Sequence, residues 1–255
     1  AIPASADDSI VYDGNNIHIE SGSLSEISKE KKLDLYVENN SDLNLSVAPY
    51  AYAINGIMAG GNQYGFGATD VAAGKKANGS IDFSGSWFED DFFEKYQIDS
   101  VDSFDVLFWA YDNDQSMKTF ESGQIHADVS NGTIQDSPVF ANAQTVYEQN
   151  GIKVDFLSKD GNDYNLCITN TTGEYFTFDV ENTSFNDYTS SDVDYDLYDK
   201  YLLNDCKLLI TIKPTDEFLE TNGIDSVEKI DFTMNVRPLA DYFSDYNTDV
   251  ISIEQ

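Results

Sequence analysis

Apolar residues alternate with polar ones in six stretches of the chain. An apolar side chain at every second position is the period of a β-strand that has one buried face and one solvent-facing face. The alternating apolar positions are Leu33, Leu35 and Val37; Phe104, Val106, Phe108 and Ala110; Ile152, Val154 and Phe156; Phe176, Phe178 and Val180; Leu208, Ile210 and Ile212; and Ile230, Phe232, Met234 and Val236. The pattern predicts six short, half-buried strands.

Two other segments have the pattern of a short helix. In the first, Ser86 and Glu89 have the spacing of a capping box, which satisfies backbone N–H groups at a helix start. Apolar residues then follow at intervals of four, at Phe88, Phe92 and Tyr96. The second segment, residues 214–223, begins Pro-Thr-Asp-Glu and ends Asn-Gly, a helix start followed by a left-handed stop. We expect one short helix in each segment.

The chain contains an internal repeat. Residues 90–110 align with residues 216–236 at a shift of 126, with eight identities that include the run Ile-Asp-Ser-Val. Earlier matched segments follow in the same order at shifts of 135 and 131, so the second copy is shorter by about nine residues. We therefore expect a flexible tail at 1–9 and two homologous domains at 10–135 and 136–255.

Short strands, turn-rich connections and one small helix per copy predict an all-β protein. Each copy is long enough to bury its own core, and strands with one buried face must pack against a second sheet. We expect two tandem antiparallel β-sandwiches, each with one short helix.

Three motifs of the first copy carry a resemblance to a known family. They are residues 35–41, Leu-Tyr-Val-Glu-Asn-Asn-Ser; residues 52–56, Tyr-Ala-Ile-Asn-Gly; and residues 98–101, Ile-Asp-Ser-Val, which follow the predicted helix. With these motifs the chain resembles the immunoglobulin-like domains of unknown function in cell-envelope lipoproteins and secreted proteins of Gram-positive bacteria. The resemblance implies immunoglobulin-like sandwiches in an extracytoplasmic, surface-attached protein, and it implies no mechanism.

The start of the sequence agrees with export. The chain opens Ala-Ile-Pro-Ala-Ser-Ala without a methionine, which suits a mature protein whose N-terminal signal segment has been removed. We expect an extracellular or cell-surface-attached protein. The sequence holds no apolar run of 18 residues, so we expect no transmembrane segment.

The charge is strongly acidic. The sequence has 46 acidic and 14 basic residues, a formal net charge of −32, and one arginine, Arg237. Nucleic-acid binding and adhesion to an anionic membrane both need clustered basic residues, so we expect neither. A hydrophobic content of 41% still predicts a folded protein with hydrophobic cores.

Candidate catalytic groups are few. The two histidines, His18 and His126, each lie between apolar neighbours, so their imidazoles should face outward from strands. No Gly-x-Ser-x-Gly motif accompanies them, and we expect no enzymatic activity. A hydrolase that uses a pair of carboxylates is the weaker alternative, because two of the many acidic residues would suffice.

The two cysteines both fall in the second copy. Cys206 keeps the inward phase of the strand that follows it, whereas Cys167 alternates against its inward neighbours. Opposite phases disfavour a disulfide, so two buried or half-buried thiols are the favoured interpretation.

Clustered carboxylates raise the question of a metal. The densest cluster is Asp192, Asp194 and Asp196, and a second is formed by Asp112 and Asp114. Neither fits an EF-hand loop, because the first has no glycine at position six and no glutamate at position twelve. We expect solvated acidic loops and no cofactor, with a loose Ca²⁺ site as the alternative.

The two copies differ most in one strand. Within residues 104–110, alternation places Leu107 and Trp109 on the outward face, and the same phase continues to Tyr111. The matched positions of the second copy are polar. Exposed apolar stripes often mark contact sites. The candidate ligand-binding residues are Leu107, Trp109 and Tyr111, together with Tyr64 and Phe66 of a glycine-rich stretch. The alternative is that this stretch, or the second domain, covers the stripe.

These observations favour a non-enzymatic, exported or cell-surface protein that binds a protein or glycan ligand or acts as a spacer. A carbohydrate-binding module that uses exposed aromatic residues is the first alternative. The carboxylate-based hydrolase is the second.

Overall fold

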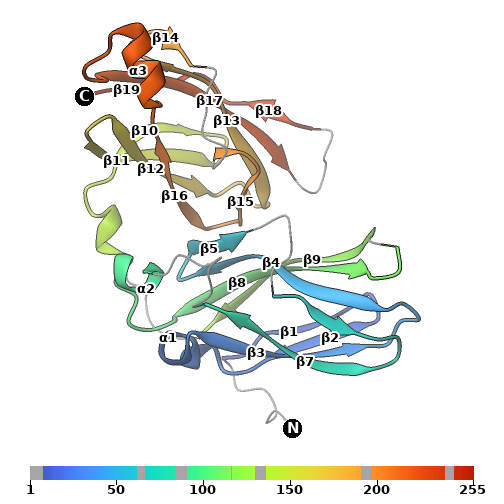
Figure 1. Cartoon of the computed structure of the whole chain (residues 1–255). Helices are drawn as coiled ribbons and strands as arrows, with labels where there is room; N and C mark the ends of the chain where they lie inside the picture. Colours follow the sequence, from blue (N-terminus) through green and yellow to red (C-terminus); the bar gives the residue numbers. More distant parts are fainter. Residues whose placement is uncertain are drawn as a thin grey trace. The chain divides into compact units, whose positions relative to one another are not determined.

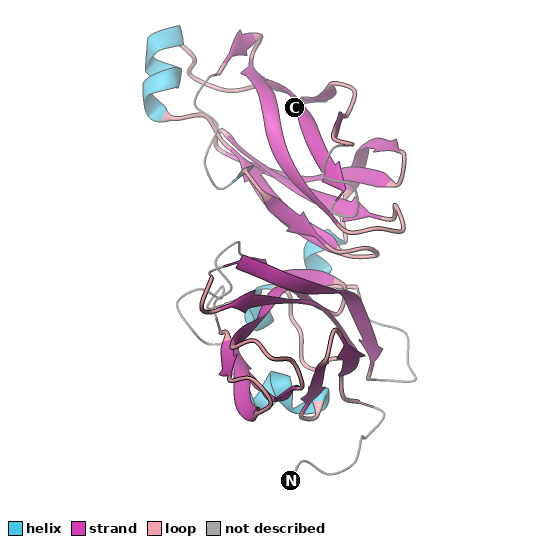
Figure 2. Cartoon of the chain, turned by 90° about the vertical axis from the view of Figure 1, so that its right-hand side faces the viewer, coloured by secondary structure: helices cyan, strands magenta, loops and turns pink. Residues whose placement is uncertain are grey.

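The computed structural model describes residues 8–61, 67–83, 91–115, 117–129, 136–190, 197–238 and 244–255. The chain forms two compact units, Ala1–Pro138 and Val139–Gln255. Figure 2 shows that strands make up most of both units and that the helices are short. The predicted all-β fold is therefore confirmed.

The first unit is a sandwich of two antiparallel sheets, which Figure 1 shows as separate layers. One sheet has the order β1 (Val11–Gly14), β2 (Ile17–Ser21), β3 (Lys32–Asn39) and β7 (Lys76–Asp82). The other has the order β5 (Ile57–Gly61), β4 (Leu45–Ile54), β8 (Ser103–Asp112) and β9 (Met117–Asp128), and β6 (Thr69–Val71) pairs with β4.

The second unit repeats this arrangement. One sheet has the order β10 (Gln144–Gln149), β11 (Ile152–Asp160), β12 (Asp163–Asn170) and β16 (Lys207–Ile212). The other has β14 (Tyr188–Thr189), β13 (Phe176–Phe185), β17 (Lys229–Pro238) and β18 (Tyr246–Asn247), with β15 (Lys200–Leu202) on β13 and β19 (Ile251–Glu254) on β17.

The strand order in each unit is that of an immunoglobulin-like sandwich. In the first unit, β2, β3 and β7 take the places of strands A, B and E, while β4, β8 and β9 take those of C, F and G. In the second unit, β11, β12 and β16 correspond to A, B and E, and β13, β17 and β19 correspond to C, F and G. The chain crosses between the sheets after β3 and after β12, as the Greek-key connection requires.

The core lies between the two sheets of each unit. The predicted inward residues Leu35 and Val37 of β3 and Phe104 and Phe108 of β8 are buried. The ring of Phe83 meets that of Phe104 edge to face, with the ring centroids 6.1 Å apart. Alternation therefore identified core side chains on both sheets.

The helices lie between strands. Helix α2 (Phe92–Lys95) precedes β8 and α3 (Asp216–Asn222) precedes β17, whereas η1 (Leu24–Glu26), α1 (Ile27–Glu30) and η2 (Pro138–Phe140) were not expected from the pattern. The hydroxyl of Thr215 accepts a hydrogen bond from the backbone N–H of Phe218, and Gly223 ends α3 in the left-handed conformation with φ of 64°. The capping box at Ser86 and Glu89 lies outside the described residues. No helix in the described part of the chain has the length and apolar character to cross a membrane.

Asn39 explains one of the motifs that the two copies share. It ends β3 fully buried, and its Nδ2 donates to the carbonyl oxygens of Leu43 at 2.8 Å and Val71 at 3.1 Å. Its Oδ1 accepts from the backbone N–H and the hydroxyl of Ser41, at 2.9 and 2.7 Å. The side chain therefore joins the turn after β3 to the end of β6.

Asn170, at the end of β12, makes the same set of bonds in the second unit. Its Nδ2 donates to the carbonyl oxygens of Glu174 at 2.8 Å and Leu202 at 3.1 Å, and its Oδ1 accepts from the N–H and hydroxyl of Thr172. Both asparagines are fully buried, and a buried amide must be paired to avoid a desolvation cost. The Asn-x-Ser/Thr motif of each copy is thus a structural device.

A second asparagine in each copy explains the Ile-Asp-Ser-Val repeat. The side chain of Asn55, in the left-handed turn after β4, donates to the carbonyl oxygen of Ser100 at 2.9 Å. Its Oδ1 accepts from the backbone N–H groups of Asp102 and Ser103, at 2.7 and 3.1 Å. Three bonds from one side chain therefore fix the loop that leads into β8.

Asn186 repeats this arrangement before β17. It donates to the carbonyl oxygen of Ser226 at 2.8 Å and accepts from the N–H groups of Glu228 at 2.8 Å and Lys229 at 3.1 Å. The serine of the repeated motif supplies a backbone acceptor to the asparagine, and the valine that follows it is buried in both copies. The shared residues therefore serve the fold.

Candidate functional site

Trp109 is the centre of an aromatic cluster on the outward phase of β8. A register shift between Pro49 and Ala51 of β4 marks a bulge at Tyr50. The ring of Tyr50 stacks on Trp109, with the ring centroids 3.4 Å apart and the planes inclined by 9°. From β9, the Lys118 Nζ lies 3.9 Å from the centroid of the Trp109 ring.

These contacts occupy both faces of the indole. Because Tyr50 covers one face in parallel, the Lys118 ammonium lies over the other, where it makes a cation–π contact. Glu121 holds the same ammonium at 2.9 Å, and the Tyr111 ring is tilted against Trp109 with the centroids 6.2 Å apart. The cluster is packed by its own side chains.

The predicted exposed stripe is wrong at Leu107, which is 0% exposed, and Trp109 and Tyr111 are half-buried. Tyr64 and Phe66 lie outside the described residues. The structure thus brings Trp109 and Tyr111 together and adds Tyr50 and Lys118, which the sequence analysis missed. The sequence pattern did not indicate the bulge in β4 or the register between β4, β8 and β9, which together place Tyr50 and Lys118 against Trp109.

The second unit has an ionic cluster on the equivalent strand, formed by Arg237, Asp179 and Asp199. Arg237 takes the position of Tyr111 in the repeat and binds Asp179 with two bonds, of 2.6 and 3.0 Å. The same guanidinium donates to Asp199 at 2.7 Å, and the backbone N–H of Asp199 donates to Asp179 at 2.6 Å. The only arginine of the chain therefore ties β17 to the segment before β15.

Asp105 and His126 form an ion pair farther along the same face of the first unit. The carboxylate of Asp105 is 3% exposed, and its Oδ1 accepts from Gln124 Nε2 at 2.8 Å and lies 2.9 Å from His126 Nδ1. Burial by itself lowers the pKa of His126, but Asp105 and Asp128 outweigh burial and raise the pKa above its ordinary value. His126 is solvent-exposed, as predicted, whereas the sequence pattern did not indicate its partner on the neighbouring strand.

No group of three or more metal-ligating side chains occurs within the described ranges. Asp112 and Asp114 form bonds within their own turn and to Asn44. Asp192, Asp194 and Asp196 lie outside those ranges, so the calcium site suggested there stays a prediction. The carboxylates that flank this cluster, Asp187 and Asp199, are each bound by a basic side chain.

The cysteines are both described, both buried and not joined by a disulfide. Burial is the main cause that raises the pKa of Cys167 to about 11. Its thiol is therefore protonated at neutral pH, and a protonated thiol is a poor nucleophile.

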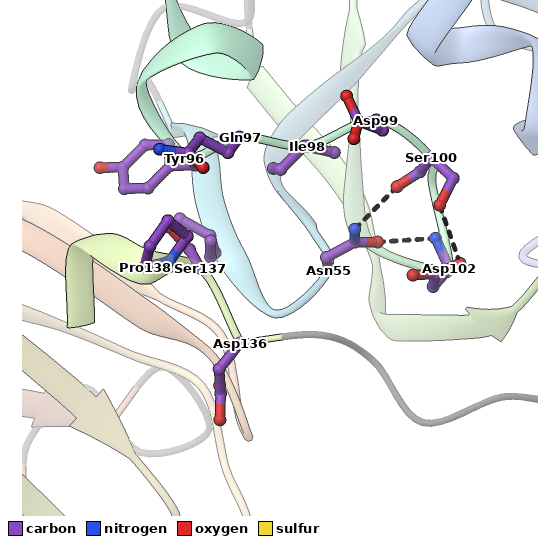
Figure 3. A pocket seen from close by; sticks show the side chains of 11 residues that line it. Asn55, Tyr96, Gln97, Ile98, Asp99, Ser100, Asp102, Asp136, Ser137 and Pro138 are labelled. Atoms are coloured by element: carbon purple, nitrogen blue, oxygen red, sulfur yellow. Dashed lines mark hydrogen bonds between the residues drawn. The ribbon is translucent and has the colours of Figure 1, made fainter. Parts of the chain in front are cut away.

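A cavity of about 200 Å³ lies at the end of the first unit that holds the Asn55 turn. Figure 3 shows Asn55 bonded to Ser100 and Asp102 on one side of it, with Tyr96 and Ile98 near by. The described lining contains carboxylates and hydroxyls, among them the Ser100 hydroxyl, which donates a hydrogen bond to Asp102 at 3.2 Å.

Neither a protein-family model nor a curated protein matches the chain. An exo-chitosanase from Amycolatopsis orientalis is similar over 98% of this chain, with 10% identity and a TM-score of 0.27. A conserved domain protein from Bacillus anthracis is similar over 96% of this chain and 89% of its own length, with 12% identity and a TM-score of 0.26. A chain of the SafA pilin–SafB chaperone complex from Salmonella enterica is similar over 89% of this chain and 90% of its own length, with 9% identity and a TM-score of 0.22.

The chain spans 26% of the length of the exo-chitosanase. At these identities and TM-scores the similarities carry no argument about activity or ligand.

Proposed function

We propose that the chain is a non-enzymatic, exported or cell-surface protein whose two immunoglobulin-like sandwiches act as a spacer or scaffold, of the kind found in cell envelopes of Gram-positive bacteria. The residues that the two copies share support this proposal. Asn39, Asn55, Asn170 and Asn186 are all engaged in fixing turns, so the repeated motifs hold the fold and provide no repeated site.

The arrangement of the titratable groups supports a protein without catalysis. His126 contacts Asp128 and also Asp105, which accepts a further hydrogen bond from Gln124. His18 contacts Asp13. The hydrogen bonds described for these two imidazoles are all with carboxylates, and none is with a hydroxyl or thiol. A nucleophile needs a base within hydrogen-bond reach. The buried, protonated thiol of Cys167 offers no substitute.

The Trp109 cluster favours the spacer over the carbohydrate-binding alternative. A sugar ring stacks on an open aromatic face, but Tyr50 and Lys118 already cover the two faces of Trp109. Stacking of a sugar would require displacement of the Lys118 ammonium from the ring and from Glu121. This observation supports the spacer.

Trp109→Ala tests the choice. The indole supports a stacked and cation-capped cluster, so its truncation should destabilise the protein by about 2–4 kcal/mol. The measurement is chemical denaturation monitored by circular dichroism, together with retention of the unaltered protein on a glycan array. Tyr188→Ala, at a side chain that is 50% exposed, is the matched control and should change stability by less than about 0.5 kcal/mol.

Specific retention of the unaltered protein on a glycan, lost in Trp109→Ala without a loss of stability, would replace the spacer by a carbohydrate-binding module.

The absence of catalysis is tested by a screen of glycoside and ester substrates with and without calcium. We expect no turnover above the buffer blank. Turnover that disappears when one acidic residue is replaced would establish a carboxylate-based hydrolase instead. Export is tested by protease treatment of intact cells, which should degrade the protein without lysis.

A further inference from the structure

Both histidines of the chain lie in the first unit, and each faces carboxylates from its own and a neighbouring strand. His18 of β2 has its Nδ1 2.6 Å from Asp13 of β1 and its Nε2 3.9 Å from Glu20. His126 of β9 has its Nδ1 2.9 Å from Asp105 of β8 and its Nε2 3.1 Å from Asp128.

The protonation state of His126 decides whether its two contacts with carboxylates attract. A neutral imidazole has one N–H donor and one nitrogen lone pair, whereas the imidazolium has two donors. Because both ring nitrogens of His126 face carboxylate oxygens at hydrogen-bond distance, only the imidazolium can donate to both. Loss of the proton places a lone pair against either Asp105 or Asp128.

The strands that these contacts hold are the edges of the two sheets. β1 ends one sheet of the first unit and β9 ends the other. Tyr12 of β1 stacks on Phe120 of β9, with the ring centroids 5.8 Å apart, so the two edges meet along one side of the sandwich. An edge strand is bonded along one side only, which makes it the part of a sheet that loosens most readily.

We propose that protonation of His126 holds the end of the edge strand β9, at residues 124–128, against β8, and that deprotonation loosens this part of the strand. The first unit thereby responds to pH in the neutral range, whereas the second unit, which has no histidine, does not. The inference goes beyond the proposed function and does not depend on it.

The other charged groups around His126 favour the same direction. The titratable groups that face its imidazole are Asp105 from β8 and Asp128 from β9, while the β4 residue opposite Asp105 is the uncharged Ala53.

The sign of the pH effect follows from the direction of the pKa of His126, which is raised in the folded unit because the two carboxylates outweigh the effect of burial. A raised pKa contributes stability that is complete below the ordinary value of about 6.5 and is lost as the pH rises through the folded value. The thiol of Cys167, with its pKa of about 11, stays protonated throughout this range.

Hydrogen exchange of the whole chain, measured at pH 5.5 and pH 7.5 and corrected for the intrinsic exchange rate, tests the proposal. The amides of residues 124–128 should lose protection on the order of fivefold at the higher pH, the range that one partly exposed ion pair provides. The amides of β17, in the unit without histidine, are the internal control and should keep their protection.

One variant isolates the contribution of the imidazole. In His126→Gln the pH effect should vanish at residues 124–128. Nuclear magnetic resonance titration of His126 gives an independent measurement, with its pKa above that of a model peptide. A pH effect that is unchanged in His126→Gln, or equal in β17, overturns the proposal.

Discussion

At the scale of single residues, buried asparagines determine where the turns lie. Asn39 and Asn170 each provide an amide that no other side chain replaces, because both the donor and the acceptor half are bonded inside the protein. A buried polar group that loses its partner costs more than the bond itself contributes. This is the physical reason why the motif is found in both copies.

Replacement of these asparagines should therefore be costly. Asn39→Ala or Asn170→Ala leaves backbone carbonyls and an N–H without partners and should lower the free energy of unfolding by about 2–4 kcal/mol. Urea denaturation measures the change. Asn40→Ala, next to Asn39 but solvent-exposed, is the control and should be nearly neutral. Equal losses in Asn39→Ala and Asn40→Ala would show that the buried amide has no special role.

At the scale of elements, the equivalent strands of the two units are held by different chemistry. The first unit places Trp109 between Tyr50 and Lys118, whereas the second places Arg237 between Asp179 and Asp199. Both arrangements fasten a neighbouring strand or loop to the strand after the helix. The sandwich thus tolerates either an aromatic or an ionic cluster on the outer side of equivalent strands, centred on Trp109 in the first unit and on Arg237, the counterpart of Tyr111, in the second.

The ionic cluster of Arg237, Asp179 and Asp199 predicts an order of stability losses. Asp179 is 8% exposed and binds Arg237 with two bonds, so Asp179→Asn should cost about 1–3 kcal/mol. The side chain of Asp199 is 53% exposed and makes one bond to the guanidinium, so Asp199→Asn should cost less than about 1 kcal/mol. Thermal unfolding of both variants checks the order, and a larger loss for Asp199→Asn would contradict it.

At the scale of the whole molecule, the net charge of −32 opposes compactness. Acidic side chains repel one another over distances that salt shortens to about 10 Å at 0.1 M ionic strength. The described carboxylates that have basic partners lie in local pairs, such as Asp34 with Lys32 and Glu38 with Lys76, and these pairs do not neutralise the total.

Screening should therefore stabilise the protein without any bound metal. The melting temperature should rise as sodium chloride is increased from low concentration, and EDTA added at constant ionic strength should leave it unchanged. Differential scanning calorimetry measures both. A fall on addition of EDTA that calcium reverses and magnesium does not would establish a calcium site, and the region around Asp192, Asp194 and Asp196 would then be the first to alter.

The sequence by itself determined six of the strands, their buried phase and the internal repeat. These properties follow from the order of residues along one strand, since alternation fixes which side chains share a face. Phe104 and Phe108 are buried as the period requires, and α3 begins and ends at the residues that the capping signals indicate.

Only the tertiary structure decided what the outward side chains meet. Leu107 is buried, Trp109 lies between Tyr50 and Lys118, and Asp105 contacts His126. No pattern in the neighbouring sequence indicates these contacts. Such contacts depend on the register between strands, and a bulge of one residue changes which side chains oppose each other. Register is a property of the paired strands together, so a single strand's pattern does not contain it.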